Sequence, residues 1–364
     1  MEFNQDFDYR IFDSLIDKNI RFAIYRFPGQ QEIHLVLQNT HKGDSMKALT
    51  DLDGNNGFVI APFRISQHNP IVLINPDVVL KGEKAIFSYL KDKDFEAVDS
   101  NIETKSEPSI NTFSQYKAKY NIFLTALKDG EFDKLVLSRT LDYSVTEDFS
   151  SGSTFKNACE KYPYNFVFLC NTPETGTWLG ISPELLVSED RGTCQTVALA
   201  GTKDISTKDW DEKNKNEQQI VVDYMEQQLT KAGYSYTKAE PFTARSGNIH
   251  HLKTEFTFSL EDKNKIGEVL DLLHPSPAVC GFPKEKAFDF ISENEGYDRH
   301  YYSGFIGTLN IEDKSDLYVN LRCMQIGKNT LRMYAGGGLL PTSDIMAEWK
   351  ETENKLQTIL AVVE

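Results

Sequence analysis

Several strand-like segments of this chain follow one another without a helix between them. They are rich in β-branched and aromatic residues and lie between turn residues, at positions 21–26, 32–37, 57–63, 135–143, 166–170, 194–198, 317–326 and 331–334. A doubly wound parallel sheet needs a crossover helix after nearly every strand, whereas antiparallel neighbours are joined by short turns. The order of the segments therefore predicts an α+β fold with antiparallel pairing.

Helical periodicity predicts five helices, at residues 112–127, 211–231, 263–273, 284–293 and 344–363. Residues 96–111 are polar and show no periodicity, so we interpret them as a surface connection. This connection separates an N-terminal portion, residues 1–110, from a larger block, residues 111–364. We expect both to belong to the same fold.

Composition limits the classes of partner and the compartment. The chain has 39 Lys plus Arg against 54 Asp plus Glu, a formal net charge of −15, so we expect no nucleic-acid partner and no anionic membrane surface. No apolar run approaches the ~20 residues that span a bilayer, and the acidic amino terminus lacks the apolar region of a signal peptide. The 5 cysteines show no CxxC spacing, which favours a reducing compartment. We therefore expect a cytoplasmic globular protein.

One predicted helix carries an acidic residue on its apolar face. In residues 211–231, Glu217 stands three and four positions before Ile220 and Val221 and so shares their inward face. A carboxylate there must be paired, protonated or bound to a metal. The alternative is a partly exposed glutamate near a helix start, where the helix dipole favours it.

The C-terminal helix has a related pattern. Glu348, Glu351 and Lys355 line one flank of its apolar stripe. One interpretation is an ordinary surface ion pair between Glu351 and Lys355, four residues apart. The other is that Glu348 and Glu351 join Glu217 at a magnesium ion, which takes one or two carboxylates and keeps waters for the rest of its shell. By contrast, His250 and His251 are adjacent and would face opposite sides of a strand, so they are poor joint zinc ligands.

Eight separated motifs decide between these interpretations of Glu217, Glu348 and Glu351. They are 134–139 (KLVLSR), 180–185 (GISPEL), 198–202 (ALAGT), 274–278 (HPSPA) with Gly281 and Pro283, 302–304 (YSG) with Gly307, the strand residue Arg322, 334–339 (YAGGGL) and 348–355 (EWKETENK). In this order and spacing the chain resembles the chorismate-utilising enzymes over residues 112–364. The resemblance implies an α+β sandwich of two sheets with helices on the outside and the active site in the cleft between the sheets. Residues 111–364 would then form the chorismate-binding catalytic domain, and residues 1–110 a variable portion of the same fold.

The resemblance also implies roles for single residues. Lys134 matches the general base and Glu184 the general acid, while Glu217 and Glu351 match carboxylates that hold Mg²⁺, with Glu348 acting through water. A lysine can act as a base only when its amine is neutral, and a glutamate can act as an acid only when it is protonated. The substrate-binding residues carried over are Leu199, Ala200, Gly201, Thr202, His274, Tyr302, Arg322, Gly336, Gly337, Gly338 and Lys355.

The residue types suit a small dianion such as chorismate. Arg322 offers a planar fork for a carboxylate, and Lys355 offers a point charge. Glycines 336–338 allow the backbone to approach an anion closely. The glycine run is not followed by Lys-Ser or Lys-Thr, so we do not expect a nucleotide.

Two positions distinguish the branches of the family. Ala200 stands where the aminodeoxychorismate branch has a nucleophilic lysine, and Lys134 where anthranilate synthases have glutamine. Isochorismate and salicylate synthases both use the lysine. We favour an Mg²⁺-dependent isochorismate synthase without an obligate protein partner, feeding menaquinone or siderophore synthesis. Salicylate synthase is the alternative, and an ammonia-using anthranilate synthase component is less favoured. Gln218 departs from the histidine that is usual beside the metal-binding glutamate.

Overall fold

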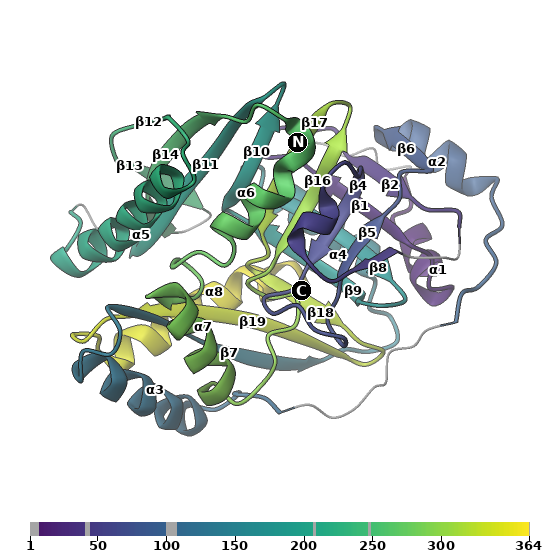
Figure 1. Cartoon of the computed structure of the whole chain (residues 1–364). Helices are drawn as coiled ribbons and strands as arrows, with labels where there is room; N and C mark the ends of the chain where they lie inside the picture. The colour runs from purple at the N-terminus through teal and green to yellow at the C-terminus, as the bar shows by residue number, and fades with distance from the viewer. Residues whose placement is uncertain (1–6, 41–43, 100–107, 207–208, 247–248, 364) are drawn as a thin grey trace.

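The computed structural model describes residues 7–40, 44–99, 108–206, 209–246 and 249–363. Within them the chain forms two antiparallel sheets with helices outside, which confirms the predicted α+β sandwich (Figure 1). The first sheet runs in the order β15 (Gly281–Phe282), β7 (Lys134–Ser144), β19 (Thr330–Leu339), β18 (Cys323–Ile326), β9 (Gly176–Ser182), β8 (Phe166–Thr172), β1 (Phe22–Arg26), β2 (His34–Leu37) and β6 (Val78–Lys81).

The second sheet runs in the order β12 (Tyr236–Lys238), β14 (Ile249–Ser259), β11 (Thr193–Asp204), β10 (Leu185–Asp190), β17 (Lys314–Val319), β16 (Phe305–Ile311), β4 (Gly57–Ala61), β5 (Ile71–Ile74) and β3 (Asp44–Met46). A further strand, β13 (Phe242–Ser246), pairs with β14. Strands that precede residue 100 occupy one end of each sheet, so the N-terminal portion of the chain contributes to both sheets.

Aromatic side chains fill the space between the sheets. Phe166 of the first sheet stacks on Tyr318 of the second with ring centroids 4.2 Å apart and an interplanar angle of 4°. Trp178 stacks on Tyr334 beside them, at 5.6 Å. These rings belong to one buried cluster that takes residues from both sheets. Burial of such large rings is the main force that holds two sheets face to face.

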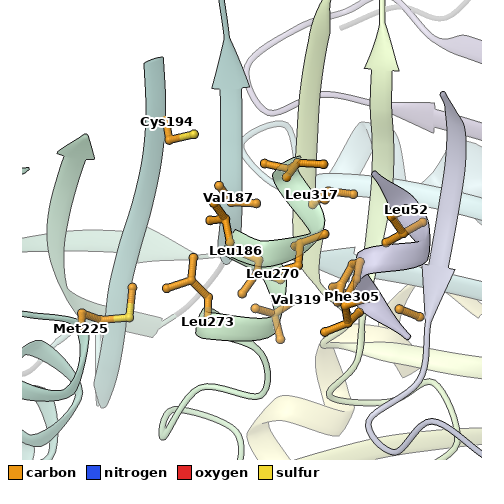
Figure 2. Packing of buried hydrophobic residues seen from close by; sticks show 14 of the residues in the cluster. Leu52, Leu186, Val187, Cys194, Met225, Leu270, Leu273, Phe305, Leu317 and Val319 are labelled. Carbon is orange, nitrogen blue, oxygen red and sulfur yellow. The ribbon is translucent and has the colours of Figure 1, made fainter. Parts of the chain in front are cut away.

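Helices cover the outer faces of the two sheets. The buried cluster on the first sheet includes residues of α1 (Ile11–Asp17), α2 (Glu83–Lys91), α4 (Ser151–Lys161) and α8 (Ile345–Val363). The cluster on the second sheet includes residues of α5 (Glu212–Lys231) and α6 (Ile266–Leu273). Figure 2 shows Leu270 and Leu273 of α6 facing Val187, Leu317 and Val319 of that sheet. The helices α3 (Phe113–Lys128) and α7 (Lys284–Asn294) pack around the β7 end of the first sheet.

The single strand predicted at residues 317–326 is wrong. The structure divides it into β17, in the second sheet, and β18, in the first. Between them Arg322 has a φ of 48°, a left-handed conformation that ends the extended run and redirects the chain. The segment thus crosses from one sheet to the other at Arg322.

A second crossing lies directly beside the first. The chain leaves the first sheet at the end of β9 and enters the second at the start of β10, with Glu184 between them. The two crossings are tied together by backbone hydrogen bonds: Val319 N donates to Glu184 O at 3.0 Å, and Ile181 N donates to Arg322 O at 3.0 Å. Each crossing therefore places a charged residue between the sheets.

Most predicted helices agree with the structure to within a few residues. The segment 263–273 differs, because a short 3₁₀ turn (Lys263–Lys265) precedes α6 and the α-helix begins only at Ile266. The helices α1, α2 and α4 were not predicted. Of the surface connection predicted at 96–111, residues 100–107 lie outside the described part of the chain. In that described part no helix is long and apolar enough to cross a membrane.

The segment after α7 contains a buried ion pair, Glu295–Arg299, and Arg299 also bonds to the backbone of β7. Arg299 donates to both carboxylate oxygens of Glu295, at 2.6 and 2.7 Å, and each side chain is 1% exposed. The same guanidinium donates to the carbonyls of Val136 and Val279, at 2.8 Å each. This network fixes the backbone behind the cavity described next.

Candidate active site

A cavity lies where the two crossings meet the glycine-rich end of β19. It holds about 610 Å³ of space between protein atoms, including the part open to solvent. Most predicted site residues line it, namely Glu184, Leu199, Ala200, Gly201, Thr202, Glu217, Tyr302, Arg322, Gly336, Gly338, Glu351 and Lys355. Residues from both sheets, α5 and α8 therefore converge here.

Four predicted site residues do not line the cavity. Lys134 is fully buried beside Glu217, and Gly337 and Glu348 lie next to the lining residues of β19 and α8. His274 is placed differently: its ring nitrogen lies 3.2 Å from the carbonyl of Pro62, and the ring packs edge-on against Phe305. Its neighbours therefore account for His274 as part of the core, away from the cavity wall.

Glu184 is a buried carboxyl group that faces a cluster of cations. It is 4% exposed and lines the cavity. Burial raises its pKa to about 8, even though Lys134, Lys355 and Arg322 act in the opposite direction. The carboxyl group is therefore protonated at neutral pH, the state in which it can donate a proton.

Arg322 is held by a histidine that the sequence analysis set aside. His251 lines the cavity, and its Nε2 lies 3.1 Å from Arg322 Nη2. Its Nδ1 lies 3.2 Å from the carbonyl of Gly201, so the network assigns the proton to Nδ1 and leaves Nε2 to accept from Arg322. Burial, followed by the charges of Arg322 and Lys355, lowers the pKa of His251 to about 3. The ring is therefore neutral.

Strand alternation could only have narrowed the choice to one of two adjacent histidines. His250 and His251 face opposite sides of β14, as expected, and His251 is the buried one of the pair. The alternation argues against a metal ion shared by both rings but does not specify which ring faces inward. Burial lowers the pKa of Arg322 to about 10, and the guanidinium stays charged at neutral pH.

Each of the three predicted metal-binding glutamates lies against a lysine. Lys134 Nζ is 3.0 Å from Glu217 Oε1, Lys213 Nζ is 2.6 Å from Glu348 Oε1, and Lys355 Nζ is 2.7 Å from Glu351 Oε1. The first contact is an ion pair without hydrogen-bond geometry, because Lys134 Nζ has no hydrogen-bond partner by angle. Within the described chain no three His, Cys, Asp or Glu side chains form a ready-made metal cluster.

Two of these carboxylates influence each other. Burial, and then the charge of Glu351, raises the pKa of Glu348 to about 7. Burial alone would also raise the pKa of Glu351, but Lys355 and Lys213 bring it below its usual value. The second oxygen of Glu348, Oε2, is buried without a hydrogen-bond partner. Lys213 and Lys355 therefore do not fully compensate the negative charge of Glu348 and Glu351.

The glycines of β19 make room for these side chains. A Cβ at Gly338 would lie 2.2 Å from Glu217 Oε1 and 2.8 Å from Lys134 Cε. At Gly337 the nearest atom would be Glu348 Oε2, at 3.1 Å. The carbonyl of Gly336 accepts from Lys355 Nζ at 2.8 Å. The glycine run thus lets the carboxylates and lysines of α5 and α8 approach the first sheet.

Comparison with known proteins identifies the class to which this fold and site belong. A family model described as chorismate binding enzyme matches residues 53–364. The chain therefore belongs to the family of chorismate-binding enzymes, and the resemblance inferred from its motifs is confirmed. The match begins at residue 53 and so includes β4, β5 and β6 from the N-terminal portion.

Curated relatives of this chain are isochorismate synthases. The isochorismate synthase EntC of Escherichia coli is 29% identical over 273 residues, which cover 72% of this chain and 69% of that protein. The isochorismate synthase MenF of Bacillus subtilis is 28% identical over 299 residues, covering 79% of this chain and 63% of that protein.

Solved structures share the fold. The putative 2,3-dihydroxybenzoate-specific isochorismate synthase DhbC from Bacillus anthracis superposes with a TM-score of 0.77 at 24% identity, over 96% of this chain and 99% of that one. Anthranilate synthase component I from Streptococcus pneumoniae gives a TM-score of 0.68 at 17% identity, over 93% of this chain and 92% of that one.

Gly338→Ala tests whether the glycine run holds the site together. The added methyl group would displace Glu217, so we expect chorismate turnover to fall by about 100-fold, the scale of a 1 Å misplacement in an active site. Gly327→Ala, just before the same strand, is the matched control, because its methyl group would approach the carbonyl oxygen of Thr330 at 3.2 Å and no residue of the site. Steady-state kinetics and thermal unfolding of both variants measure this. Equal losses in the two variants would contradict it.

Proposed function

We propose that this chain is an isochorismate synthase, an isomerase that adds water at C2 of chorismate and removes the hydroxyl group at C4. One feature carries the proposal above all: the buried carboxyl group of Glu184, whose pKa burial raises to about 8, lines a cavity that Arg322 and Lys355 also line. A buried acid facing an anionic substrate is suited to protonating a departing hydroxyl group. Its curated relatives are named for this activity.

The reaction needs a base on one side of the ring and an acid on the other. Lys134, once neutral, takes a proton from water as its oxygen bonds to C2. The ring double bonds then shift, and the C4 hydroxyl group leaves with the proton of Glu184. One water enters and one leaves, so the product is an isomer of the substrate. Lys134 starts β7 in the first sheet, and Glu184 lies on the crossing from β9 to β10, so the two come from different segments of the chain.

The substrate's two carboxylates require local cations in a chain of net charge −15. Arg322 and Lys355 line the cavity and supply them. Arg322 is buried and oriented by His251, so it presents a fixed fork to a carboxylate. Lys355 adds a point charge next to the glycine run. Binding by these two groups would orient the ring between Lys134 and Glu184.

The carboxylates beside the cavity fit a magnesium ion. Glu348 has a buried, unpartnered oxygen, and the charge of its neighbour Glu351 contributes to its raised pKa. A divalent cation would relieve both conditions. Magnesium is usually held by one or two carboxylates plus waters and substrate oxygens, which matches a site that is not a ready-made cage. Glu351, Glu348 and Glu217 would hold the ion, and it would neutralise and orient a carboxylate of the substrate.

Water is the expected nucleophile for two reasons. Ala200 puts a small, unreactive side chain on the cavity wall where the aminodeoxychorismate branch has a nucleophilic lysine. Lys134 is retained as the water-activating residue. We therefore propose that the enzyme needs no ammonia and no glutaminase partner. All five cysteines are free and buried, which supports our expectation of a cytoplasmic enzyme.

The direct test is to incubate the purified protein with chorismate and Mg²⁺ in the absence of ammonia. We expect isochorismate without pyruvate, and no conversion with EDTA. Lys134→Ala should give no product while keeping its fold, which circular dichroism can check. Salicylate with pyruvate would assign the enzyme to the salicylate branch. Anthranilate formed only with ammonia would overturn the water-activating role of Lys134.

The raised pKa of Glu184 predicts that both kcat and the unfolding free energy fall as the pH rises. The carboxyl group loses its proton as the pH rises through about 8, so kcat should fall there. The unfolded chain titrates this group near ~4.3, so the stability that protonation gives the fold is full below that pH and is lost on rising through the folded pKa. Glu184→Gln should therefore lose less unfolding free energy between about pH 5 and about pH 9 than wild type does.

Denaturant unfolding at several pH values measures the second effect. Glu131→Gln is the matched control, because Glu131 is exposed in the turn between α3 and β7 and does not line the cavity. If Glu184→Gln and wild type show parallel pH profiles, Glu184 is not protonated in the fold and its role as the acid is wrong.

A further inference from the structure

One edge of β11 has no strand beside it where it borders the cavity. The neighbouring strand β10 pairs with β11 only at residues 193–195, among the described residues. On the opposite edge β14 stays paired with β11 from residue 193 to 204. Residues 198–202 of β11 therefore need other partners on their free edge, because unpaired buried backbone groups are costly. These residues include the cavity wall from Leu199 to Thr202.

Two amide side chains of α5 occupy that edge. Gln218 Oε1 accepts from the N–H of Ala200 at 2.8 Å, and its Nε2 donates to the carbonyl of Ala198 at 3.0 Å. One helical turn earlier, Asn214 Oδ1 accepts from the N–H of Thr202 at 2.8 Å. Alternate backbone groups of β11 are thus bonded by an amide pair four residues apart on the helix. The side chains reproduce the pattern that a paired strand would offer.

Both amides are themselves held in place. Gln218 is 3% exposed, and its Nε2 also lies 3.1 Å from Thr254 Oγ1 of β14. Asp211 Oδ1, at the start of α5, accepts from both the backbone N–H and the side-chain Nδ2 of Asn214, at 2.8 Å each. The orientation of each amide is therefore fixed before it meets β11.

The contacts along this edge of β11 are connected, through Gly201 and His251, to Arg322. The register of β11 shifts between Ala200 and Thr202, and Gly201 has a φ of 61° at that point. A Cβ on Gly201 would lie 2.9 Å from the carbonyl oxygen of Asn214, so α5 packs directly on this bulge. The bulge turns the carbonyl of Gly201 toward His251.

His251 in turn orients Arg322, because its other ring nitrogen, Nε2, lies 3.1 Å from Arg322 Nη2. Helix α5 is therefore connected to Arg322 through three successive contacts. Glu217 lies on the same helix, between the two amides. One helix thus positions a carboxylate of the proposed metal site and, through β11, the guanidinium that binds substrate.

We propose that Asn214 and Gln218 are positioning residues, whose amides replace a missing strand beside β11 and hold the bulge at Gly201 so that His251 orients Arg322 for the substrate's carboxylate. This rests on the proposed function only in assigning the carboxylate to Arg322. It also gives a structural role to glutamine at a position where related enzymes usually have histidine. Gln218 supplies an acceptor and a donor to the backbone and makes no contact that would turn Glu217.

The test is chorismate affinity in a variant that binds without turning over. In a Glu184→Gln background, Gln218→Met keeps the size of the side chain but leaves the N–H of Ala200 unpaired. We expect the Kd for chorismate, measured by calorimetry, to rise about tenfold or more, the scale of losing a partner for a buried polar group. Gln219→Met is the matched control, because the adjacent Gln219 is exposed and its side chain donates to Asp223 on its own helix.

A double-mutant cycle separates positioning from general destabilisation. If the effect travels through the imidazole, Gln218→Met should add little to a variant that already carries His251→Ala. Gln218→His, which keeps one acceptor and one donor, should restore most of the affinity. An unchanged Kd in Gln218→Met, or fully additive effects with His251→Ala, would overturn the proposal.

A second variant and the choice of Kd as the measured quantity allow the test to decide the proposal in each case. If Gln218→Met does not fold, Asn214→Ala removes the other edge contact, and the same rise in Kd is expected. The outcome is independent of the product formed: if wild type binds chorismate but makes no isochorismate, the proposed function fails while the Kd comparison still decides the positioning role.

Discussion

The burial of charge between two sheets is the constraint on which this site depends. An ionised side chain in that space must have a partner, because the cost of removing it from water is otherwise several kcal/mol. Glu217, Glu348 and Glu351 each have a lysine within 3.0 Å. Glu184 has no such ion pair in the described chain, and burial keeps it protonated at neutral pH. Lysine partners thus keep the other three carboxylates suited to bind a metal ion, whereas Glu184 keeps its proton and is suited to act as an acid.

The fold supplies these pairs by bringing distant segments together. The two crossings at Glu184 and Arg322 are 138 positions apart but are hydrogen-bonded to each other. The glycines of β19 let α5 and α8 approach the first sheet closely enough for Lys134 to reach Glu217 and for Lys355 to reach the carbonyl of Gly336. The inter-sheet aromatic cluster keeps the two halves of the cavity in register. Packing and electrostatics therefore act on the same few residues.

Part of this architecture could be predicted from the sequence. Consecutive strands indicated antiparallel sheets, and the acidic residues on α5 and α8 indicated a polar site facing inward. The break at Arg322 could not be predicted from local pattern, because arginine carries no signal for a left-handed conformation in the way that glycine does. Nor could the lysine partners of Glu217 and Glu348, since the pair Lys213–Glu348 joins residues 135 positions apart. The pair Glu351–Lys355, four residues apart on one helix, could be predicted.

The histidines show the same limit. The motif containing His274 drew attention to that residue, but its ring belongs to the core beside Phe305. His251 was dismissed as a metal ligand and proves to be the partner of Arg322. Adjacent histidines on a strand indicate only that one ring faces inward. Which one does so depends on the register of β14 with β11, and that register includes a bulge that local sequence does not specify.

The measurement that tests the central claim most directly is an isotope experiment. Wild-type enzyme would be incubated with chorismate and Mg²⁺ in water enriched in oxygen-18, and the product analysed by mass spectrometry with fragmentation. Addition of water at C2 with loss of the C4 hydroxyl group predicts one labelled oxygen, located at C2. An unlabelled product would mean that the hydroxyl group moves within the substrate, and it would contradict the roles of Lys134 and Glu184 as base and acid.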